Sequence, residues 1–369
     1  RVETVSSEAG LAQLAGESWD DLVRAMPRPS PFLLHSWLVE WWRHYGRGAE
    51  LTVHVAYRGD RLVGALPLCT RRRLGLRVSE FVGGTWAILG DALVAPGEDA
   101  SAVAAGLAER AMAGEHDFAD LFGLPGSSRL VAALPQGSLR LVERLDAPVF
   151  DLGGSWDAVY TARLSSKARS ERRRRMRQLE RLGTVECAIA RGREEIATAL
   201  EEAFRVHALR WHGRRDPSGF ITETGKRFHR AALLRLADED VTRISTIRLE
   251  GRAVAFSLYL QLAGRAYGLT MAFDPAYARY GLGAEAKLQS LEASASEGIR
   301  RVELLGTAAE HKRRFTDRFE PVYEGVGLER TLRGRAAKDA LIGGIRMRRA
   351  AKRSKTAKRL YERVPFRRS

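Results

Sequence analysis

Cysteine and long apolar runs are both scarce in this sequence. Its 369 residues include only two cysteines, Cys69 and Cys187, whose separation supports neither a disulfide framework nor a zinc site, and no other metal site is expected. This cysteine usage fits a reducing, cytoplasmic setting. The longest apolar candidate, residues 253–264, is interrupted by Gln261 and is well short of the ~20 residues that a membrane span needs. The sequence starts at Arg1 without a basic-then-apolar leader, so we expect no signal peptide.

Acidic residues are in the minority, and the positive excess is concentrated in two blocks. The sequence holds 61 Lys and Arg against 45 Asp and Glu, a formal net charge of +16. Residues 331–369 carry fourteen basic and two acidic residues, and residues 163–182 carry nine basic and two acidic residues. The rest of the chain is close to neutral. The sequence therefore predicts a globular body with two basic elements, which suit an anionic partner.

Two parts of the chain share one pattern, which indicates an internal duplication. Residues 51–68 alternate apolar side chains around a Gly-Asp turn, as in a β-hairpin, and residues 244–260 have the same design. In each half a later strand ends in an acidic residue, Asp120 or Glu303, followed by two apolar residues and a glycine. Duplication is the economical explanation, and the alternative is a chance recurrence of units that are common in α/β proteins.

The length argues for two domains, and turn-forming residues at positions 151–156 lie between the halves. Helix caps and apolar spacing predict helices over residues 164–182, 194–211 and 284–296. We therefore expect an N-terminal unit, a C-terminal unit and a basic helical tail, at residues 1–150, 151–330 and 331–369.

The most informative segment, residues 265–283, predicts a strand and then a loop that leads into the 284–296 helix. Gly281 and Gly283 let backbone N–H groups approach an anion, and the helix N-terminus favours negative charge. The pattern fits a pyrophosphate cradle, although a G-x-G before a helix is more often only a turn. The counterpart in the first half, residues 90–97, contains Pro96 and lacks a G-x-G.

This arrangement resembles GNAT acyltransferases, whose pyrophosphate loop reads Gln/Arg-x-x-Gly-x-Gly/Ala. The matching stretch, residues 278–283, begins with Ala278 and has its arginine displaced to Arg279. Over nearly the whole chain, the order of motifs resembles the double-GNAT acetyltransferases associated with cellulose biosynthesis, distant relatives of Fem-type peptidyltransferases. The residues that carry this resemblance lie at positions 30–46, 64–68, 207–215, 273–283 and 304–315.

The resemblance implies an α/β fold of two tandem GNAT-like lobes, with mixed, mainly antiparallel sheets flanked by helices. It implies a degenerate N-terminal lobe and a C-terminal lobe that binds acetyl-CoA or another acyl-CoA as co-substrate. The implied cofactor contacts come from the strand and the loop: Leu269, Thr270, Met271, Arg279, Tyr280, Gly281, Gly283 and Ala284.

Three residues are candidates for the chemistry of acyl transfer, in which a base takes the proton of the acceptor and donors stabilise the oxyanion. Glu303, on the strand after the cradle helix, is a candidate base or else a solvated charge at a strand end. Lys312 matches a lysine of the Fem-like relatives, and the alternative is a surface lysine. His311 is a further candidate base, or else a solvent-exposed histidine in a charged run.

Arg210, Trp211 and His212 are candidates for the acceptor site. Trp211 offers a flat face to a sugar or an aliphatic group, and Arg210 can pair with a carboxylate or phosphate. Trp211 can equally end the apolar stripe of its helix. The aromatic run from Phe32 to Tyr45 has helical spacing and is better explained by core packing.

Three classes of function fit these features. The first is an acyl-CoA-dependent N- or O-acyltransferase that acts on a cell-envelope or exopolysaccharide precursor, or on a similar small acceptor. The second is a Fem-like transferase that takes its acyl group from aminoacyl-tRNA, whose phosphates would match the basic blocks. The third is a non-catalytic protein that binds nucleic acid or membrane on a GNAT scaffold. We also expect residues 331–369 to be dispensable for folding and to attach the protein to an anionic membrane surface.

Overall fold

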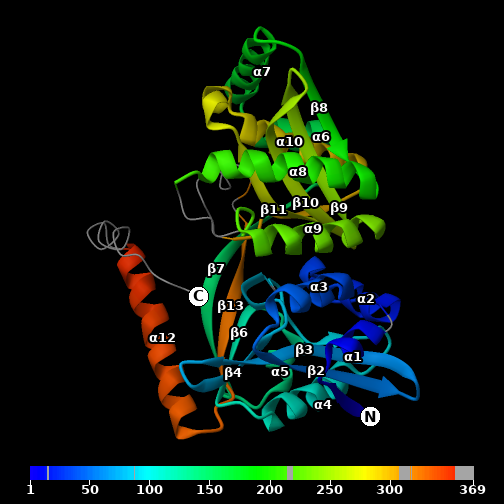
Figure 1. The fold of residues 1–369 in the computed structure, drawn as a ribbon, viewed down its shortest axis with the longest axis vertical. Helices are drawn as coiled ribbons and strands as arrows, with labels where there is room; N and C mark the ends of the chain where they lie inside the picture. The colour runs from blue at the N-terminus through cyan, green and yellow to red at the C-terminus, as the bar shows by residue number, and fades with distance from the viewer. Residues whose placement is uncertain (15, 87, 214–218, 307–315, 317, 354–369) are drawn as a thin grey trace.

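The computed structural model describes residues 1–14, 16–86, 88–213, 219–306, 316 and 318–353, and of residues 348–353 only the backbone (Figure 1). The first half contains β1 (Val2–Val5), α1 (Glu8–Gln13), α2 (Gly16–Arg24), η1 (Pro31–Leu33), α3 (His35–Tyr45), β2 (Ala49–Arg58), β3 (Arg61–Arg73), β4 (Leu76–Phe81), η2 (Gly84–Trp86), β5 (Leu93–Val94), α4 (Ala100–Ala113), β6 (Phe118–Pro125), α5 (Arg129–Ala133) and β7 (Leu139–Asp151). The second half contains α6 (Trp156–Arg163), α7 (Ser166–Glu180), β8 (Val185–Ala190), α8 (Gly192–Trp211), α9 (Glu223–Asp238), β9 (Thr242–Leu249), β10 (Arg252–Leu262), β11 (Arg265–Phe273), η3 (Pro275–Tyr280), α10 (Leu282–Ser296), β12 (Arg301–Glu303), β13 (Phe319–Gly327) and α12 (Leu332–Arg353).

Both halves contain the repeated unit that the sequence predicts. In the first half, β2, β3 and β4 form an antiparallel meander, α4 crosses over, and β6 returns parallel to β4. In the second half, β9, β10 and β11 form the same meander, α10 crosses over, and β12 returns parallel to β11. The fold is α/β with a mixed sheet flanked by helices, as expected. We call the unit around β1–β6 the first lobe and the unit around α6–β12 the second lobe.

The two lobes share one sheet because long strands pass between them. The strand order is β1-β2-β3-β4-β6-β13-β7-β12-β11-β10-β9-β8, with β5 beside β3. β7 pairs with β13 along Leu139–Pro148 and then with β12 along Val149–Asp151. β13, from the second half of the chain, lies between β6 and β7 and so completes the sheet of the first lobe.

Apolar packing also crosses from one lobe to the other. The largest core cluster contains residues of both lobes, and α3 packs against α9. Trp37, which is fully buried, meets Phe228 edge to face with ring centroids 4.9 Å apart. Phe32 and Trp41 are also buried, so the aromatic run near α3 is core packing, as predicted.

The basic tail begins as a docked helix. Ile342 and Ile345 of α12 are buried with Val78, Phe118 and Val326 on the first-lobe sheet. The N-terminus of the helix is fixed too: Thr331 donates a hydrogen bond to Asp117, and a Cβ at Gly334 would clash with the Asp117 carbonyl oxygen. These contacts argue against the prediction that residues 331–369 are dispensable for folding, because removal of the docked part would uncover apolar strand residues. Among the described residues, every helix is too short or too polar to cross a bilayer.

Candidate acyl-donor site

The predicted glycine loop lies between η3 and α10. Gly281 has a left-handed backbone, with φ +69°, and α10 begins there without a side-chain cap. The N–H groups of Ala284 and Glu285 donate to the Gly281 carbonyl. The N–H groups earlier in the first turn have no acceptor within an α-helix, so this helix start can receive an anion.

The two glycines of the loop are required for different structural reasons. Gly281 supplies the left-handed turn, which other residues adopt at a cost. Gly283 faces β11, and a Cβ at this position would lie 2.9 Å from the Phe273 ring. Gly283 therefore allows α10 to pack closely on the strand, whereas Gly281 supplies the turn at which the helix begins.

The basic helix α7 lies beside this turn and forms a large cavity with it. A Cβ at Gly281 would come within 3.0 Å of an Arg175 guanidinium nitrogen. The cavity has a volume of about 1250 Å³ and extends along α7, the end of α8, the end of β11 and the start of α10. Its charged lining residues are Arg163, Lys167, Glu171, Arg172, Arg174, Arg175, Arg210, Glu285 and Lys287.

Both carboxylates of this lining are already paired with arginine. Glu285 accepts two hydrogen bonds from Arg172, at 2.5 and 2.6 Å, which raise the pKa of that guanidinium. Glu171 accepts hydrogen bonds from Arg174 and from Arg175, and these lower its pKa to about 2. The remaining cations leave the cavity strongly positive, which favours a polyanionic ligand.

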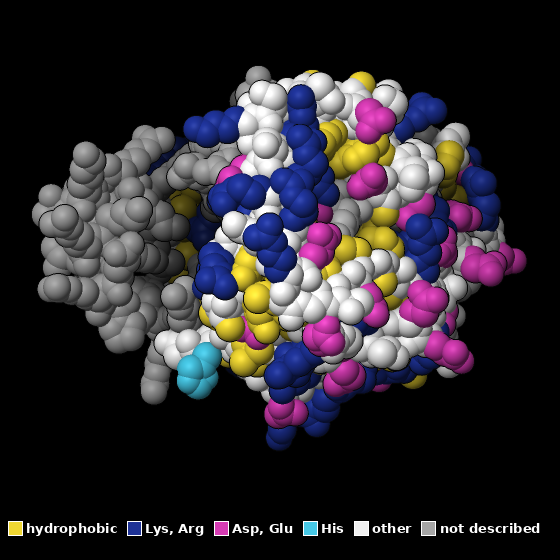
Figure 2. Space-filling model, turned by 90° about the horizontal axis from the view of Figure 1, so that it is seen from above, with side chains coloured by type: hydrophobic (Ala, Val, Ile, Leu, Met, Phe, Trp, Pro, Cys, Tyr) yellow, Lys and Arg dark blue, Asp and Glu magenta, His cyan; other side chains and the backbone are white. Residues whose placement is uncertain are grey.

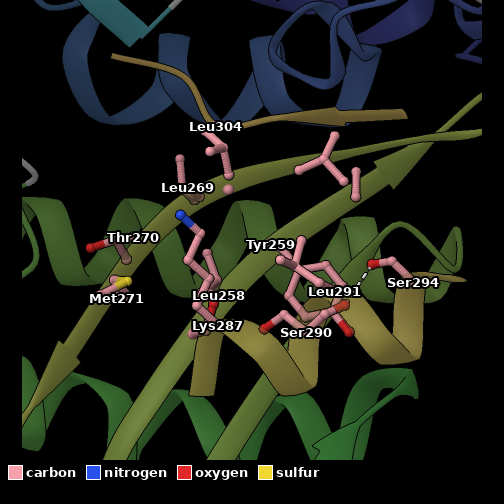
Figure 3. Close-up of a pocket in the computed structure, with 14 residues that line it drawn as sticks. Leu258, Tyr259, Leu269, Thr270, Met271, Lys287, Ser290, Leu291, Ser294 and Leu304 are labelled. Atoms are coloured by element: carbon pink, nitrogen blue, oxygen red, sulfur yellow. Dashed lines mark hydrogen bonds between the residues drawn. The ribbon is translucent and has the colours of Figure 1, made fainter. Parts of the chain in front are cut away.

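A second, smaller cavity adjoins the first beneath the sheet (Figure 3). Its volume is about 160 Å³, and Met271 and Lys287 line both cavities. The cavity lies where β11 and β12 separate. The parallel pairing of these two strands covers only Arg265–Tyr267 of β11. Further along β11 there is a bulge at Leu269, a residue that has no partner in the pairing of β11 with β10. Figure 3 shows Lys287 extending from α10 so that its nitrogen lies next to Leu269.

The structure brings most of the expected cofactor residues together at these cavities. Tyr280, Gly281, Gly283 and Ala284 line the large one, Leu269 and Thr270 line the small one, and Met271 lines both. Arg279 is the exception. Its guanidinium is exposed, hydrogen-bonds to the Tyr280 hydroxyl at 2.6 Å and stacks on that ring. The displaced arginine thus lies outside both linings.

Two of the three expected acceptor residues also line the large cavity. The Arg210 guanidinium stacks over the Phe273 ring at 4.9 Å, and Trp211 stacks on His207 with centroids 5.9 Å apart. Both side chains are partly exposed at the end of α8. His212 is exposed at the helix C-terminus and is absent from the described lining of either cavity.

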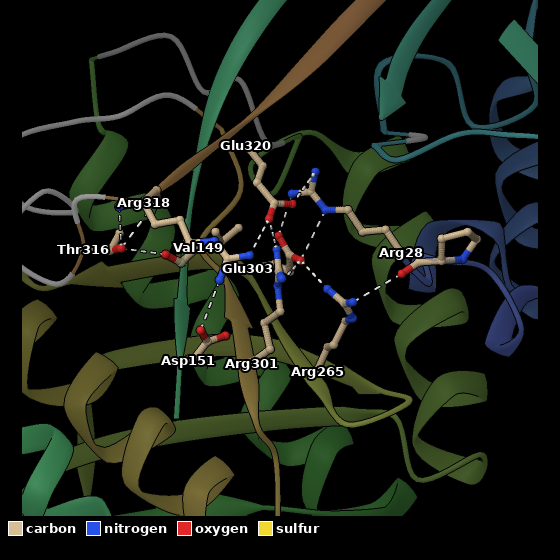
Figure 4. Close-up of polar contacts among 10 residues, drawn as sticks. Arg28, Val149, Asp151, Arg265, Arg301, Glu303, Thr316, Arg318 and Glu320 are labelled. Atoms are coloured by element: carbon tan, nitrogen blue, oxygen red, sulfur yellow. Dashed lines mark hydrogen bonds and ion pairs between the residues drawn. The ribbon is translucent and has the colours of Figure 1, made fainter. Parts of the chain in front are cut away.

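Glu303 occupies a different place from the one expected of a base. Its side chain is completely buried, and it is absent from the described lining of both cavities. Arg28 binds both of its oxygens, at 3.2 and 2.7 Å, while Arg265 and Arg301 bind one of them at 3.0 and 3.2 Å (Figure 4). Glu303 is therefore neither a solvated strand-end charge nor a group that faces the donor cavities.

These contacts instead join the two lobes. Arg28 lies in the first lobe, just before η1, whereas Glu303 ends β12 of the second lobe. Arg265 also donates to the Pro27 carbonyl, and the Tyr267 hydroxyl donates to that of Pro29. Burial raises the pKa of Tyr267, so it remains a neutral donor. The cluster fixes the first lobe against the fork between β11 and β12.

The remaining catalytic candidates, His311 and Lys312, lie outside the described residues. Within the described part of the chain, His, Cys, Asp and Glu form no group that could hold a metal ion.

Sequence reasoning missed the contribution of α7 and of Lys287 to this site. The signal was present for α7, because nine basic residues between positions 163 and 182 had been assigned to an unspecified anionic partner. For Lys287, a single lysine in an alanine-rich helix gives no indication that it lines a cavity.

Comparison with known proteins agrees with this geometry. Residues 166–313 match the acetyltransferase (GNAT) domain family. No curated protein matches the chain.

Several solved structures share the fold at low sequence identity. FemX is 11% identical, with a TM-score of 0.59, over 85% of this chain and 96% of FemX. A C-terminal domain assigned to a lysylphosphatidylglycerol synthetase of Agrobacterium fabrum is 15% identical, with a TM-score of 0.56, over 91% of this chain and 95% of that domain. A protein of unknown function from Bacteroides thetaiotaomicron is 13% identical, with a TM-score of 0.57, over 88% of this chain and 99% of that protein. The chain thus has a GNAT-like acetyltransferase fold whose structural neighbours include a Fem-type protein.

Proposed function

We propose that this protein is an acyl-CoA-dependent N- or O-acyltransferase whose donor occupies the two adjoining cavities of the second lobe. The observation that carries this proposal is the large cavity, where an uncapped helix start faces the cations of α7. Coenzyme A bears a pyrophosphate and a further phosphate, so a positive cavity at a helix N-terminus suits it.

The separation of β11 and β12 supports the same donor. Beyond Tyr267, the side of β11 that faces β12 leaves the parallel pairing. An extended chain with amide groups can add to such a strand edge by main-chain hydrogen bonds. The arm of coenzyme A is a chain of this kind, and it would lead from the Gly281 turn toward the small cavity.

The reaction would be direct acyl transfer. An acceptor nitrogen or oxygen attacks the thioester carbonyl, its proton passes to a base, and the thiolate leaves and takes up a proton. We retain Lys312 and His311 as candidates for the oxyanion contact and the base. Glu303 acts in this proposal as a positioning residue that holds the lobes together, since its oxygens are bound by three arginines.

We propose a cell-envelope or exopolysaccharide precursor, or a similar amine- or hydroxyl-bearing metabolite, as the acceptor, as in the cellulose-associated proteins that the sequence resembles. Trp211 presents a flat apolar face to the cavity, and Arg210 presents a guanidinium held over Phe273. A ring and a charged or polar group on one acceptor would match these two side chains.

The exposed face of α7 favours a second candidate, a transferase that uses aminoacyl-tRNA. Arg173, Arg177 and Arg181 are exposed there, away from the cavity. Figure 2 shows a column of Lys and Arg side chains on this end of the molecule. Such a stripe can follow a phosphate backbone.

The basic tail suggests a location as well as a partner. We propose that the protein is cytoplasmic and that residues beyond position 353 hold it at the anionic inner face of the membrane. Six of the fourteen basic residues after position 330 lie beyond residue 353 and support this, since each contributes roughly 1 kcal/mol of attraction near such a surface.

Calorimetry on two matched variants tests the donor. Arg175→Ala removes a cation beside Gly281 and should weaken the binding of coenzyme A by roughly tenfold, because charged hydrogen bonds contribute about 1.5–3 kcal/mol. Arg173→Ala, on the exposed face of the same helix, should leave that affinity unchanged. Equal affinities for all three proteins would contradict the proposal. Binding of tRNA but not of coenzyme A would select the second candidate.

A further inference from the structure

The small cavity extends beyond what an acetyl group needs. It lies past the large cavity as seen from the Gly281 turn, between α10 and the strands β10, β11 and β12. Lys287 and Met271 stand where the two cavities meet. A donor bound at the helix start would thus bring its thioester end to this junction. This step rests on the proposed function, because it takes coenzyme A as the carrier.

The walls of the small cavity are apolar despite several hydroxyl-bearing residues. The hydroxyl of Ser290 donates to the Ala286 carbonyl at 2.9 Å, and that of Ser294 donates to the Ser290 carbonyl at 2.7 Å. Both groups are thereby engaged by their own helix. Half of the remaining lining is aliphatic, namely Leu258, Ala266, Leu269, Leu291, Val302 and Leu304. Its polar members are Ser257, Tyr259, Thr270 and Lys287, and Lys287 lies where the two cavities meet.

The volume indicates how much of a ligand fits. At about 30 Å³ for a water-sized group, 160 Å³ holds roughly five such groups. An acetyl group would leave most of this space empty, and an empty apolar cavity forgoes favourable contacts. We infer that the small cavity is the acyl pocket of the enzyme, and that the donor carries an unbranched, uncharged acyl chain of about four to six carbons.

The test is a binding series that needs no acceptor. Calorimetry compares free coenzyme A with its acetyl, butyryl, hexanoyl, dodecanoyl and succinyl thioesters. Each buried methylene group should tighten binding roughly three- to fourfold. We therefore expect hexanoyl-CoA to bind at least tenfold more tightly than acetyl-CoA, with no further gain for the dodecanoyl thioester.

Two variants fill the pocket from opposite walls. Ser290→Leu adds bulk from α10 without orphaning a partner, since the serine hydroxyl only bonds its own helix. Gly268→Val adds bulk from β11, where a Cβ would meet only the Glu303 carbonyl oxygen, at 4.0 Å. Each variant should bind hexanoyl-CoA at least tenfold more weakly than the unaltered protein does, and its affinity for free coenzyme A should be unchanged. Ser296→Leu, on the exposed face of α10, is the matched control and should change neither affinity.

The alternative outcomes are distinct. Equal binding of acetyl-CoA and hexanoyl-CoA would overturn the acyl pocket, as would tightest binding of succinyl-CoA, which would point to recognition of an anion by Lys287. If both filling variants weaken the binding of free coenzyme A as much as the binding of its thioesters, the cavity holds the arm of the donor and the inference is wrong. If the unaltered protein binds no form of coenzyme A, the proposed function itself fails.

Discussion

The crossover helices of the two lobes differ at their N-termini, because one has a side-chain cap and the other has none. In the first lobe, the carboxylate of Asp99 caps α4 by accepting the N–H groups of Ser101 and Ala102. In the second lobe, α10 begins at Gly281 without a side-chain cap, beside the arginines of α7. One helix start is thus neutralised by the chain itself, and the other is available to an external anion.

The two helix starts also differ in the number of cations around them. Glu98, next to the α4 cap, pairs with Arg58 and Arg61. The cavity beside α10 has more Lys and Arg than carboxylates in its lining, although Arg172, Arg174 and Arg175 are paired with Glu285 or Glu171. This agrees with the proposal that the first lobe is a degenerate copy without a donor site. The comparison teaches that two units with the same strand order can differ at the start of their crossover helix, where one has a side-chain cap and the other has none.

The largest expected effect comes from replacing Glu303, which ends β12, and the comparison is with Asp120, which lies within β6. Glu303→Gln should lower the free energy of unfolding by about 3–5 kcal/mol, because three arginines would lose a buried counter-charge. Asp120→Asn, at the matching position of the repeat, should cost less than about 1 kcal/mol, since its partner Arg73 is half exposed. Urea denaturation measures both. Similar losses of unfolding free energy in the two variants would mean that the burial of the Glu303 cluster does not determine how much it stabilises the protein.

The next prediction concerns a variant in which α10 begins with an aspartate, as α4 does in the first lobe. Gly281→Asp should weaken coenzyme A binding roughly tenfold or more, because a carboxylate would occupy the helix start. Gly281→Asn is the matched control, since asparagine also tolerates the left-handed backbone but adds no charge. Calorimetry should show a much smaller loss for the asparagine variant. If the two variants bind alike, the backbone rather than the charge controls the site.

Truncation separates the docked part of the tail from the rest. A chain ending at residue 353 should keep its melting temperature and lose sedimentation with anionic liposomes. A chain ending at residue 330 should also melt lower, because Val78, Phe118 and Val326 would be uncovered. Neutral liposomes are the control. Equal sedimentation of the full chain and the 353 truncation would contradict a targeting role, and displacement by tRNA would favour nucleic acid as the partner.

The smallest effect concerns a histidine of the first lobe that has no titratable counterpart in the second. Burial lowers the pKa of His54 to about 4, and the alignment of Asp60 with Gly251 sets Ser245 opposite it. The unfolded chain binds a proton more readily, so stability is lost as the pH falls from about 6.5 toward 4.

Replacement should reveal that pH dependence. His54→Ser should reduce the loss of unfolding free energy between pH 7 and about pH 5 by roughly 1–2 kcal/mol. His212→Ser, at an exposed position, is the control and should leave the pH profile unchanged. Denaturation series at several pH values measure this. An unchanged profile for His54→Ser would show that other groups govern the acid sensitivity.

Local patterns in the sequence were enough to predict the repeated unit. The hairpins appear as alternating apolar residues around their turns, and α8 and α10 lie within two residues of their predicted bounds. The pairing of β13, from the second half of the chain, with β7, from the first half, was not predictable, because the pairing of distant strands leaves no local signal in the sequence. The helix α9, whose Phe228 meets Trp37 of the first lobe, was also missed, since its burial depends on a partner far away in the chain.

The site was predicted in part for similar reasons. Glycine spacing before a helix marked Gly281, and the terminal aromatic of α8 marked Trp211, because both depend on neighbours in sequence. Glu303 was misplaced because its environment is set by Arg28, which is 275 positions away. A carboxylate at a strand end looks the same in sequence whether solvent or three arginines surround it.

The position of β13 also constrains how the protein is made. Residues 319–327 separate β6 from β7 in the finished sheet, so the first lobe cannot complete its sheet until these residues have been synthesised. Until then, the edges of β6 and β7 lack the neighbour that they have in the native sheet, and such edges readily pair with other chains. The order of synthesis therefore leaves these two edges open in the nascent first lobe, and a chain without residues 319–327 would lack the strand that joins β6 to β7.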